Sequence, residues 1–337
     1  MSVYFGKKIK EIRKNNNLTQ TEFASIFGYK DKSMIAHIEN GDTEMSNDKI
    51  TILIERFNVD ANELFINKEK PAEEKQVITT IYDYYNQYDE DSRLKRRTGQ
   101  VEYLTTSKYI HEYLKPGDKI IEIGAGTGAY SISLAEEGYD VTSIELVKHN
   151  LDILKSKITN DMNIKTYQGN ALDLSMFPSE SFDITLVLGP MYHLFTKEDK
   201  VKCLLEAKRI TKKEGYIFVA YCMNEATIIT YVFESNGLTE VIDKNLLTRD
   251  WHCKSDPKEI FELVRIEDIN EYNKESDLKR IKIVATDGAS RYIRDHLNKM
   301  SDEVFSKWID FHLHTCERID LIGATHHSLD ILKKNNI

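Results

Sequence analysis

The chain has 337 residues, which is more than one typical domain and enough for two or three. Its net charge of −9 argues against a protein whose whole surface binds nucleic acid or an anionic membrane. The charge is uneven, because residues 1–70 hold 11 basic and 11 acidic side chains whereas residues 71–337 hold 35 and 44. This asymmetry predicts two bodies with different partners.

The sequence carries no signal for export or membrane insertion. Its start, from Met1 to Lys8, lacks the apolar run of a secretory signal. No stretch approaches the ~18 consecutive apolar residues of a membrane span. The four cysteines are widely spaced and include no Cys-x-x-Cys pair, so the expected compartment is a reducing cytoplasm.

Residues 1–66 are expected to form an all-α domain of five short helices. Apolar residues recur every three or four positions, and capping residues or glycines separate the runs. The clearest start signal is Thr19-Gln-Thr-Glu22, a capping box in which Thr19 accepts from a first-turn N–H while Glu22 reaches back. Gly41 ends the third helix, and the fifth is expected over residues 60–65.

The run Leu18-Thr-Gln-Thr-Glu-Phe-Ala24, followed by Ile35-Ala-His-Ile-Glu-Asn-Gly41, resembles the phage-repressor or XRE helix-turn-helix family. The resemblance implies a recognition helix in the major groove of double-stranded DNA and a homodimer that reads paired half-sites. By position, Gln20 touches phosphate. The residues implied to face base edges are Lys32, Ser33 and His37.

The turn before the recognition helix, residues 28–34, is one residue longer than the commonest form, so the register of Lys32 and Ser33 is open by one. The alternative to DNA binding is a helical domain that serves dimerisation alone, since residues 1–70 carry no net charge. A local basic face favours DNA instead. Its members are Lys7, Lys8, Lys10, Arg13 and Lys14.

Residues 67–92 are expected to be a linker and a lid helix. Residues 67–75 are polar, charged and contain a proline, which is typical of a linker. The tyrosine-rich stretch that begins at Tyr82 precedes the first strand and predicts a helix that covers a ligand. The alternative is a helix with one solvated face, or one that forms a dimer interface.

From Lys119 onward, short apolar or β-branched runs alternate with helical stretches, as in a parallel sheet. Residues 93–337 are therefore expected to form a doubly wound, Rossmann-like α/β domain, with seven strands. Ligands of such sheets bind beyond the carboxyl ends of the strands. The strands identified are residues 119–124, 141–146, 163–167, 182–188, 216–221 and 328–332.

The first strand runs into Glu122-Ile-Gly-Ala-Gly-Thr-Gly128. Glycines let the backbone approach a ligand closely, and the N-terminus of the following helix favours an anion. Glu145 ends the next strand, where a carboxylate can accept hydrogen bonds from ribose hydroxyls. Taken alone, these two features fit NAD or S-adenosylmethionine.

Three later segments distinguish the two cofactors, namely residues 169–174, 188–193 and 206–217. Together with the glycine loop they resemble the class I S-adenosylmethionine-dependent methyltransferases of the small-molecule type. The resemblance implies an enzyme with S-adenosylmethionine as its cofactor. The implied contacts are Glu122, Gly124, Ala125, Gly126, Gly128, Glu145, Leu146, Asn170, Ala171 and Leu188, with Tyr88 and Arg97 from the lid region.

Methyl transfer requires an aligned acceptor, exclusion of water and, for some acceptors, removal of a proton. His193 follows the fourth strand and is the candidate general base; the alternative is a histidine that only shapes the pocket. His326 and His327 are secondary candidates. No metal is expected, because the run that contains His312, His314 and Cys316 looks helical and residues two apart then point in different directions.

Residues 224–279 are expected to be an insertion on the acceptor side of the sheet. Its aromatic residues suit an acceptor pocket: Tyr231, Phe233, Trp251 and Phe261. After the fourth strand the chain reads Leu-Gly-Pro-Met-Tyr and lacks the Pro-Pro motif of DNA amino methyltransferases. Tyr192 is expected to form a wall of the pocket.

The hypothesis from sequence is a methyltransferase for a small-molecule O or N acceptor, fused to a DNA-binding transcriptional regulator. One alternative is a regulator that senses S-adenosylmethionine or a metabolite with little or no methyl transfer. A second alternative is a methyltransferase for nucleic acid or protein.

Overall fold

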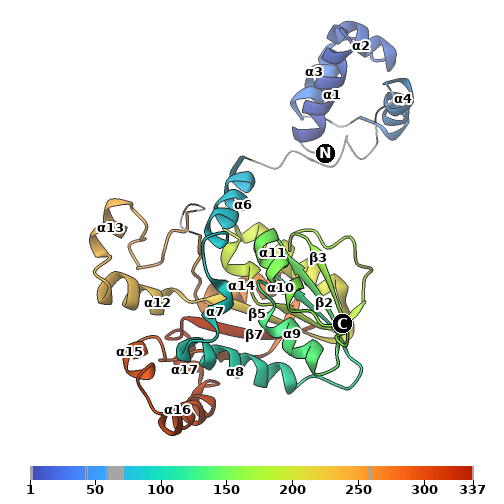
Figure 1. Ribbon diagram of the computed structural model, residues 1–337. Helices are drawn as coiled ribbons and strands as arrows, with labels where there is room; N and C mark the ends of the chain where they lie inside the picture. The colour runs from blue at the N-terminus through green and yellow to red at the C-terminus, as the bar shows by residue number, and fades with distance from the viewer. Residues whose placement is uncertain are drawn as a thin grey trace. The chain divides into compact units, whose positions relative to one another are not determined.

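The structure is a computed structural model that describes residues 3–41, 43, 45–57, 59, 72–256, 258 and 260–335. The chain divides into two compact units, Met1–Lys75 and Gln76–Ile337, called here the first and second units. Figure 1 draws the first unit in blue and the second from cyan to red. Among the described helices, none has the length and apolar character needed to cross a membrane.

The described part of the first unit is helical (Figure 1). Phe5, Phe23 and Ile35 are fully buried in its core, as their helical spacing predicts. The capping box at Thr19 and Glu22 is confirmed. The fifth predicted helix, residues 60–65, lies outside the described residues. The helices are α1 (Val3–Asn15), α2 (Gln20–Ile26), α3 (Ser33–Asn40) and α4 (Asn47–Phe57).

A buried ion pair ties α1 to α3. Arg13 Nη2 lies 3.1 Å from Glu39 Oε2, and Gln20 at the start of α2 donates its Nε2 to the same oxygen at 2.9 Å. Arg13 also donates to the Leu18 carbonyl at 2.9 Å. Arg13 is thus buried, and its charge is neutralised by Glu39. The prediction that Arg13 belongs to a local basic face is therefore wrong.

A single seven-stranded sheet organises the second unit, as the sequence predicts. The strand order is β3-β2-β1-β4-β5-β7-β6, with β7 antiparallel to both of its neighbours and the other pairs parallel. The order reverses between β1 and β4, which is where such sheets bind ligands. The strands are β1 (Lys119–Ile123), β2 (Asp140–Glu145), β3 (Ile164–Gln168), β4 (Phe182–Val187), β5 (Thr211–Cys222), β6 (Leu278–Ala285) and β7 (His327–Lys334).

Helices cover the sheet and close its apolar core. Helices α9 and α10 pack on β2 and β3, and α11 packs on β4 and β5. The central strands are nearly all buried, as expected for parallel strands covered on two faces. These helices are α8 (Arg97–His111), α9 (Ala129–Glu136), α10 (Lys148–Ser156), α11 (Lys197–Ile210) and α14 (Ile266–Glu275).

Three excursions from the sheet supply the walls of the site. The first precedes β1 and holds α6 (Ala72–Tyr85) and α7 (Glu90–Arg93). The second follows β5 and holds α12 (Asn224–Thr227), the π-helix η2 (Ile228–Glu234) and α13 (Leu238–Asp243). The third joins β6 to β7 and holds α15 (Arg294–Leu297), α16 (Asp302–Thr315) and α17 (Ile319–Ile322), all visible in Figure 1.

The predicted insertion, residues 224–279, is shorter than expected. Its last part is α14, which packs against α11 and β6 and so belongs to the layers of the sheet. The excursion after β5 therefore ends before Ile266. The third excursion had no predicted role.

Candidate functional site

The glycine loop after β1 requires its glycines. Gly124, Gly126 and Gly128 have φ values of +73°, +55° and +85°, a region that residues with a Cβ rarely adopt. A Cβ on Gly124 would lie 2.7 Å from Pro190 Cδ, and one on Gly128 would lie 2.6 Å from Leu154 Cγ. The loop therefore has to consist of backbone with almost no side chains where it packs against Pro190 and Leu154. Ala125, which lies within the loop, is buried.

Glu145 links the end of β2 to this loop. Its Oε2 accepts the Gly126 N–H and its Oε1 accepts the Val147 N–H, both at 2.8 Å. The side chain is buried, and burial raises the pKa of the carboxyl above its usual value. Each carboxylate oxygen has a second lone pair, so the carboxylate can accept further hydrogen bonds from ligand hydroxyls.

Glu122 lies beneath the loop. The Ser131 hydroxyl at the start of α9 donates to Glu122 Oε2, and the Ser143 hydroxyl donates to the Ser131 oxygen at 2.7 Å. Burial raises the pKa of Glu122 to about 8. Glu122 lines a small cavity at the loop together with Leu188, and its hydrogen bond holds the first turn of α9 in place.

The other predicted cofactor contacts surround the carboxyl ends of β2 and β3. The Leu146 carbonyl accepts the Tyr82 hydroxyl at 2.7 Å, so the lid helix α6 is bonded to the segment after β2. Asn170 Oδ1 accepts the Leu172 N–H at 3.0 Å, and Ala171 is buried beside it.

Arg97 and Tyr88 differ from the prediction. Arg97 Nη2 donates to Asp302 Oδ1 at 2.7 Å and its guanidinium lies 4.6 Å from the Phe305 ring, outside the cavities at the strand ends. Arg97 is therefore not a cofactor contact in this structure, because its guanidinium binds Asp302 and packs on Phe305, both in α16. Tyr88 stacks on Tyr84 at 5.1 Å and lines a second, larger cavity.

This larger cavity has a volume of about 440 Å³. Aromatic rings from the lid, from the segment after β4 and from the excursion after β5 form much of its wall. Glu90, Arg93 and Tyr192 line both this cavity and the small one at the glycine loop, so the two cavities adjoin. The aromatic lining residues are Tyr84, Tyr85, Tyr88, Tyr192, Tyr231 and Phe261, and the predicted Phe233 and Trp251 are half exposed outside it.

His193 lies in the 3₁₀ helix η1 (Pro190–His193) after β4, and both of its ring nitrogens are engaged. Nδ1 lies 2.8 Å from the Ile260 carbonyl, which can only accept, so Nδ1 carries the proton. Nε2 therefore accepts the Tyr85 hydroxyl, at 2.9 Å. Burial lowers the pKa of His193 to about 4. Tyr85 lines the cavity and His193 stands behind it.

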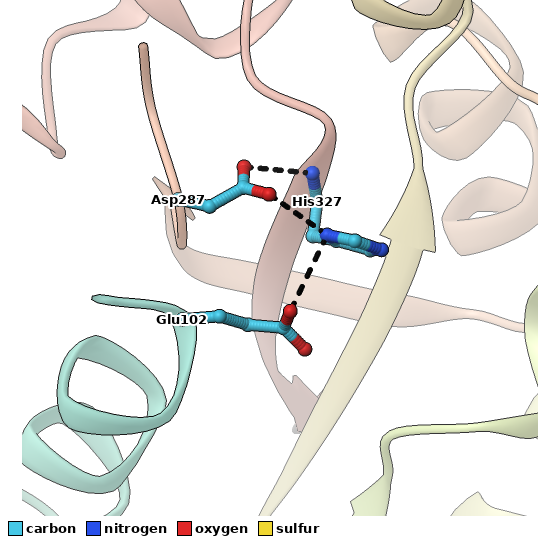
Figure 2. Close-up of side chains that lie close together, drawn as sticks. All are labelled: Glu102, Asp287 and His327. Atoms are coloured by element: carbon cyan, nitrogen blue, oxygen red, sulfur yellow. Dashed lines mark hydrogen bonds and ion pairs between the residues drawn. The ribbon is translucent and has the colours of Figure 1, made fainter. Parts of the chain in front are cut away.

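A cluster of charged side chains at the wall of the larger cavity was not predicted from the sequence. It consists of Glu102, Asp287, His327 and Arg93. His327 Nδ1 lies 2.9 Å from Asp287 Oδ2 and 3.5 Å from Glu102 Oε2 (Figure 2). Arg93 binds both oxygens of Glu102 at 3.0 and 2.8 Å. Despite desolvation, the two carboxylates raise the pKa of His327 to about 10, so its imidazole is protonated at neutral pH.

The ligand atoms of Glu102, Asp287 and His327 lie within 4.8 Å of one another, a spacing that suits a metal ion. Cationic side chains already neutralise both carboxylates: Arg93 pairs with Glu102, and Arg291 Nε lies 3.3 Å from Asp287 Oδ2. We therefore assign this cluster as an ion-pair network. The segment of His312, His314 and Cys316 is helical, as expected.

His326 lies beside His327 at the start of β7. Its Nε2 lies 2.9 Å from Thr230 Oγ1, and burial lowers its pKa to about 4. It lines the larger cavity, as His327 does.

Of the predicted DNA contacts, Lys32 and Ser33 lie at the start of α3, His37 lies in its last turn, and Gln20 begins α2. Lys32, Ser33 and His37 are exposed, and the Asp31 carboxylate accepts the Ser33 N–H at 2.7 Å. Gln20 is half-buried and bonded to Glu39, as described above.

Comparisons with known proteins agree with this geometry. Residues 121–219 match the family described as a methyltransferase domain, and residues 9–64 match the helix-turn-helix family. The second unit thus carries a region that matches a methyltransferase domain, and the first carries a region that matches a helix-turn-helix domain.

Curated relatives match only in part. The putative methyltransferase YqeM of Bacillus subtilis is 27% identical over 115 residues, which are 34% of this chain and 47% of that protein. The eEF1A lysine and N-terminal methyltransferase homolog of Drosophila melanogaster is 30% identical over 182 residues, 51% of this chain and 26% of that protein. The glycine/sarcosine N-methyltransferase of Aphanothece halophytica is 28% identical over 103 residues, 30% and 39%. The chain spans less than half the length of these relatives.

Among solved structures, a methyltransferase from Thermotoga maritima described as a possible histamine N-methyltransferase is 18% identical, with a TM-score of 0.49. The similarity covers 77% of this chain and all of that one, 100%.

Proposed function

We propose that the second unit transfers the methyl group of S-adenosylmethionine to an oxygen or nitrogen atom of a small molecule. The observation that carries this proposal is the shared wall of the two cavities, formed by Glu90, Arg93 and Tyr192. A donor at the glycine loop and an acceptor in the aromatic cavity are then neighbours, as in-line transfer requires.

The residues at the strand ends fit the cofactor. The bare backbone of the glycine loop suits its amino-acid end, and the close approach of Gly124 to Pro190 and of Gly128 to Leu154 leaves no room for side chains that would shift this backbone. Glu145 suits the ribose hydroxyls, Leu146 a face of the adenine, and Asn170 and Ala171 its edge. When bound, the sulfonium supplies an activated methyl group, and no metal is required for its transfer.

The chain's own part is to orient the acceptor and exclude water. The lid helix α6 reaches the cofactor side through the bond from Tyr82 to the Leu146 carbonyl. Tyr85 lines the cavity, and His193 behind it holds the Tyr85 hydroxyl through Nε2. His193 is therefore a positioning residue in this proposal, in place of the general base predicted from sequence.

The size of the larger cavity favours a small acceptor. A volume of about 440 Å³ is in the range of small-molecule sites. The relatives include both protein and small-molecule methyltransferases by name, so the comparisons leave the acceptor open. The acidic balance of residues 71–337 also disfavours a nucleic acid acceptor.

We also propose that the first unit binds double-stranded DNA as a homodimer and makes the chain a transcriptional regulator. The exposed Lys32, Ser33 and His37 on or next to α3 support this, because such helices read base edges in the major groove. The chain's four cysteines, all in the second unit, form no disulfide bond, which suits a reducing cytoplasm.

The experiment is a transfer assay with the full-length protein, methyl-labelled S-adenosylmethionine and a small-molecule extract. We expect label in the small-molecule fraction, reduced at least about tenfold by Glu145→Ala, since charge-assisted hydrogen bonds to the ribose are lost. Glu136→Ala, on the exposed face of α9, is the matched control and keeps the activity. Label found only in added protein or DNA, or none in the small molecules, would overturn the proposal.

A further inference from the structure

We propose that the acceptor is an aromatic carboxylate, whose negative charge is held by His327 and Arg291 in the larger cavity. This inference rests on the proposed function and names the substrate class of the same site.

At the wall of the larger cavity, the cationic side chains face the cavity and most of the acidic side chains that pair with them lie behind the wall. Only one acidic residue, Glu90, is among the described residues that line the larger cavity, whereas the cationic lining residues are Arg93, Lys254, Arg291, Arg294 and His327. The acids that compensate them stand behind the wall: Asp287 is buried behind His327 and Arg291, and Glu102 behind Arg93. An entering ligand therefore meets cations first.

His327 has the geometry of an anion donor. Asp287 accepts from its Nδ1 at 2.9 Å and from its backbone N–H at 3.1 Å, which fixes the ring. Figure 2 shows the other ring nitrogen, Nε2, pointing away from both carboxylates. Nε2 has no hydrogen-bond partner among the described residues, and the ring lines the cavity. The raised pKa of His327, about 10, keeps a proton on Nε2 at neutral pH.

Arg291 and Arg294 continue the cationic side towards solvent. Arg291 pairs with Asp287 at 3.3 Å and is 41% exposed, so its remaining N–H groups are open to a ligand. Arg294 lies 3.7 Å from Glu234 and is 51% exposed, at the outer part of the cavity. Guanidinium and imidazolium groups together suit a planar carboxylate.

The aromatic side of the cavity suits a flat ring. Tyr84 and Tyr88 are stacked at 5.1 Å, and the Phe261 ring lies 5.8 Å from Tyr84 and 5.9 Å from Tyr192. Such rings bury an aromatic ligand by offset or edge contacts. An aromatic carboxylate therefore satisfies both sides of the cavity at once.

The test measures binding of three probes of one shape to the full-length protein saturated with S-adenosylhomocysteine. The probes are 2-naphthoate, 2-naphthamide and 2-naphthylmethylamine, which are anionic, neutral and cationic at pH 7.5. We expect the anion to bind at least about tenfold more tightly than the amide, as one charge-assisted hydrogen bond allows. Equal binding of acid and amide, tightest binding of the amine, or no measurable binding of the acid would overturn the inference.

Two variants locate the effect. His327→Gln and Arg291→Gln should each reduce the preference for acid over amide to about threefold or less, because one cationic donor is lost. The matched controls are His314→Gln and Arg318→Gln, both exposed and outside the cavity. If His327→Gln does not fold, the preference of Arg291→Gln for acid over amide tests the assignment by itself. A preference unchanged in a folded variant would overturn the assignment.

Failure of this inference differs from failure of the proposed function. Calorimetry of S-adenosylhomocysteine binding is run on every sample. Binding of this product without a preference for the acid contradicts the acceptor class alone. Absence of product binding contradicts the proposed function itself.

Discussion

His193 and His327 lie close to the same end of the sheet, yet their surroundings leave His193 neutral and make His327 a cation. His193 faces a carbonyl and a phenol, neither of which stabilises a cation by charge, and burial lowers its pKa to about 4. His327 faces Asp287 and Glu102, which raise its pKa to about 10. The first histidine is neutral and positions a tyrosine, and the second is a fixed cation at a cavity wall.

The neutral state of His193 predicts acid sensitivity. The folded protein keeps it neutral down to about pH 4, whereas an unfolded chain protonates it near 6.5. Stability is therefore lost as the pH falls from 6.5 towards 4. Between pH 7 and 5 this group should reduce the free energy of unfolding by about 2 kcal/mol.

Urea unfolding at the two pH values measures this. His193→Gln should lower stability at pH 7 and remove about 2 kcal/mol of the difference between pH 7 and 5. The exposed His314→Gln should leave the difference as in the wild type. A difference unaltered by His193→Gln would show that His193 is not held neutral in the folded protein.

How far the sequence predicted the site depends on how local each signal is. The glycine loop and Glu145 follow directly after predicted strands, so their place could be foreseen. The ion-pair network could not, because Glu102, Asp287 and His327 come from a helix, a loop and a strand far apart in sequence, and no local pattern joins them. Arg97 failed for the same reason, since its partner Asp302 is 205 residues away.

At the scale of elements, the sheet and the first four helices were predictable from periodicity and caps. The border of the insertion was not, because α14 is an amphipathic helix whose assignment depends on packing against α11. The excursion between β6 and β7 carries Arg291 and Arg294, two of the cations that line the larger cavity, yet its short helices have no distinguishing pattern. Function here depends on long-range contacts between loops.

The glycine loop gives a prediction at this scale. Gly124→Ala should weaken S-adenosylhomocysteine binding at least about tenfold, because the new Cβ would lie 2.7 Å from Pro190 Cδ and displace the loop from the cofactor. Gly138→Ala is the matched control: its φ is +93°, but nothing lies within 4 Å of the added Cβ. Both substitutions place an alanine at a positive φ and so strain the backbone. Only Gly124→Ala should also weaken the binding of S-adenosylhomocysteine, as measured by calorimetric titration.

If both variants bind equally well, the close approach of Gly124 to Pro190 has no part in holding the cofactor.

At the scale of the whole molecule, the net charge of −9 conceals two local exceptions. The charged residues that line the larger cavity of the second unit are mainly cationic, although residues 71–337 are acidic overall. Residues 1–70 carry no net charge, and the basic face of the first unit is smaller than predicted because Arg13 is paired with Glu39. The cations that line the larger cavity therefore support the anionic acceptor proposed for the second unit.

DNA binding by the full-length chain is testable by selection from random DNA, which should yield a two-fold symmetric site. Lys32→Gln should weaken binding to that site by about tenfold, as expected for loss of one base or phosphate contact. Lys202→Gln, an exposed position on α11, should leave the affinity unchanged. Failure to enrich any sequence would contradict the regulator proposal.

The central claim is that the second unit binds S-adenosylmethionine at the glycine loop and Glu145. Calorimetric titration of the full-length protein with S-adenosylhomocysteine tests it most directly. We expect saturable binding to one site, weakened at least about tenfold in Glu145→Ala and retained in Glu136→Ala. No binding by the wild-type protein, or equal binding by both variants, would contradict it.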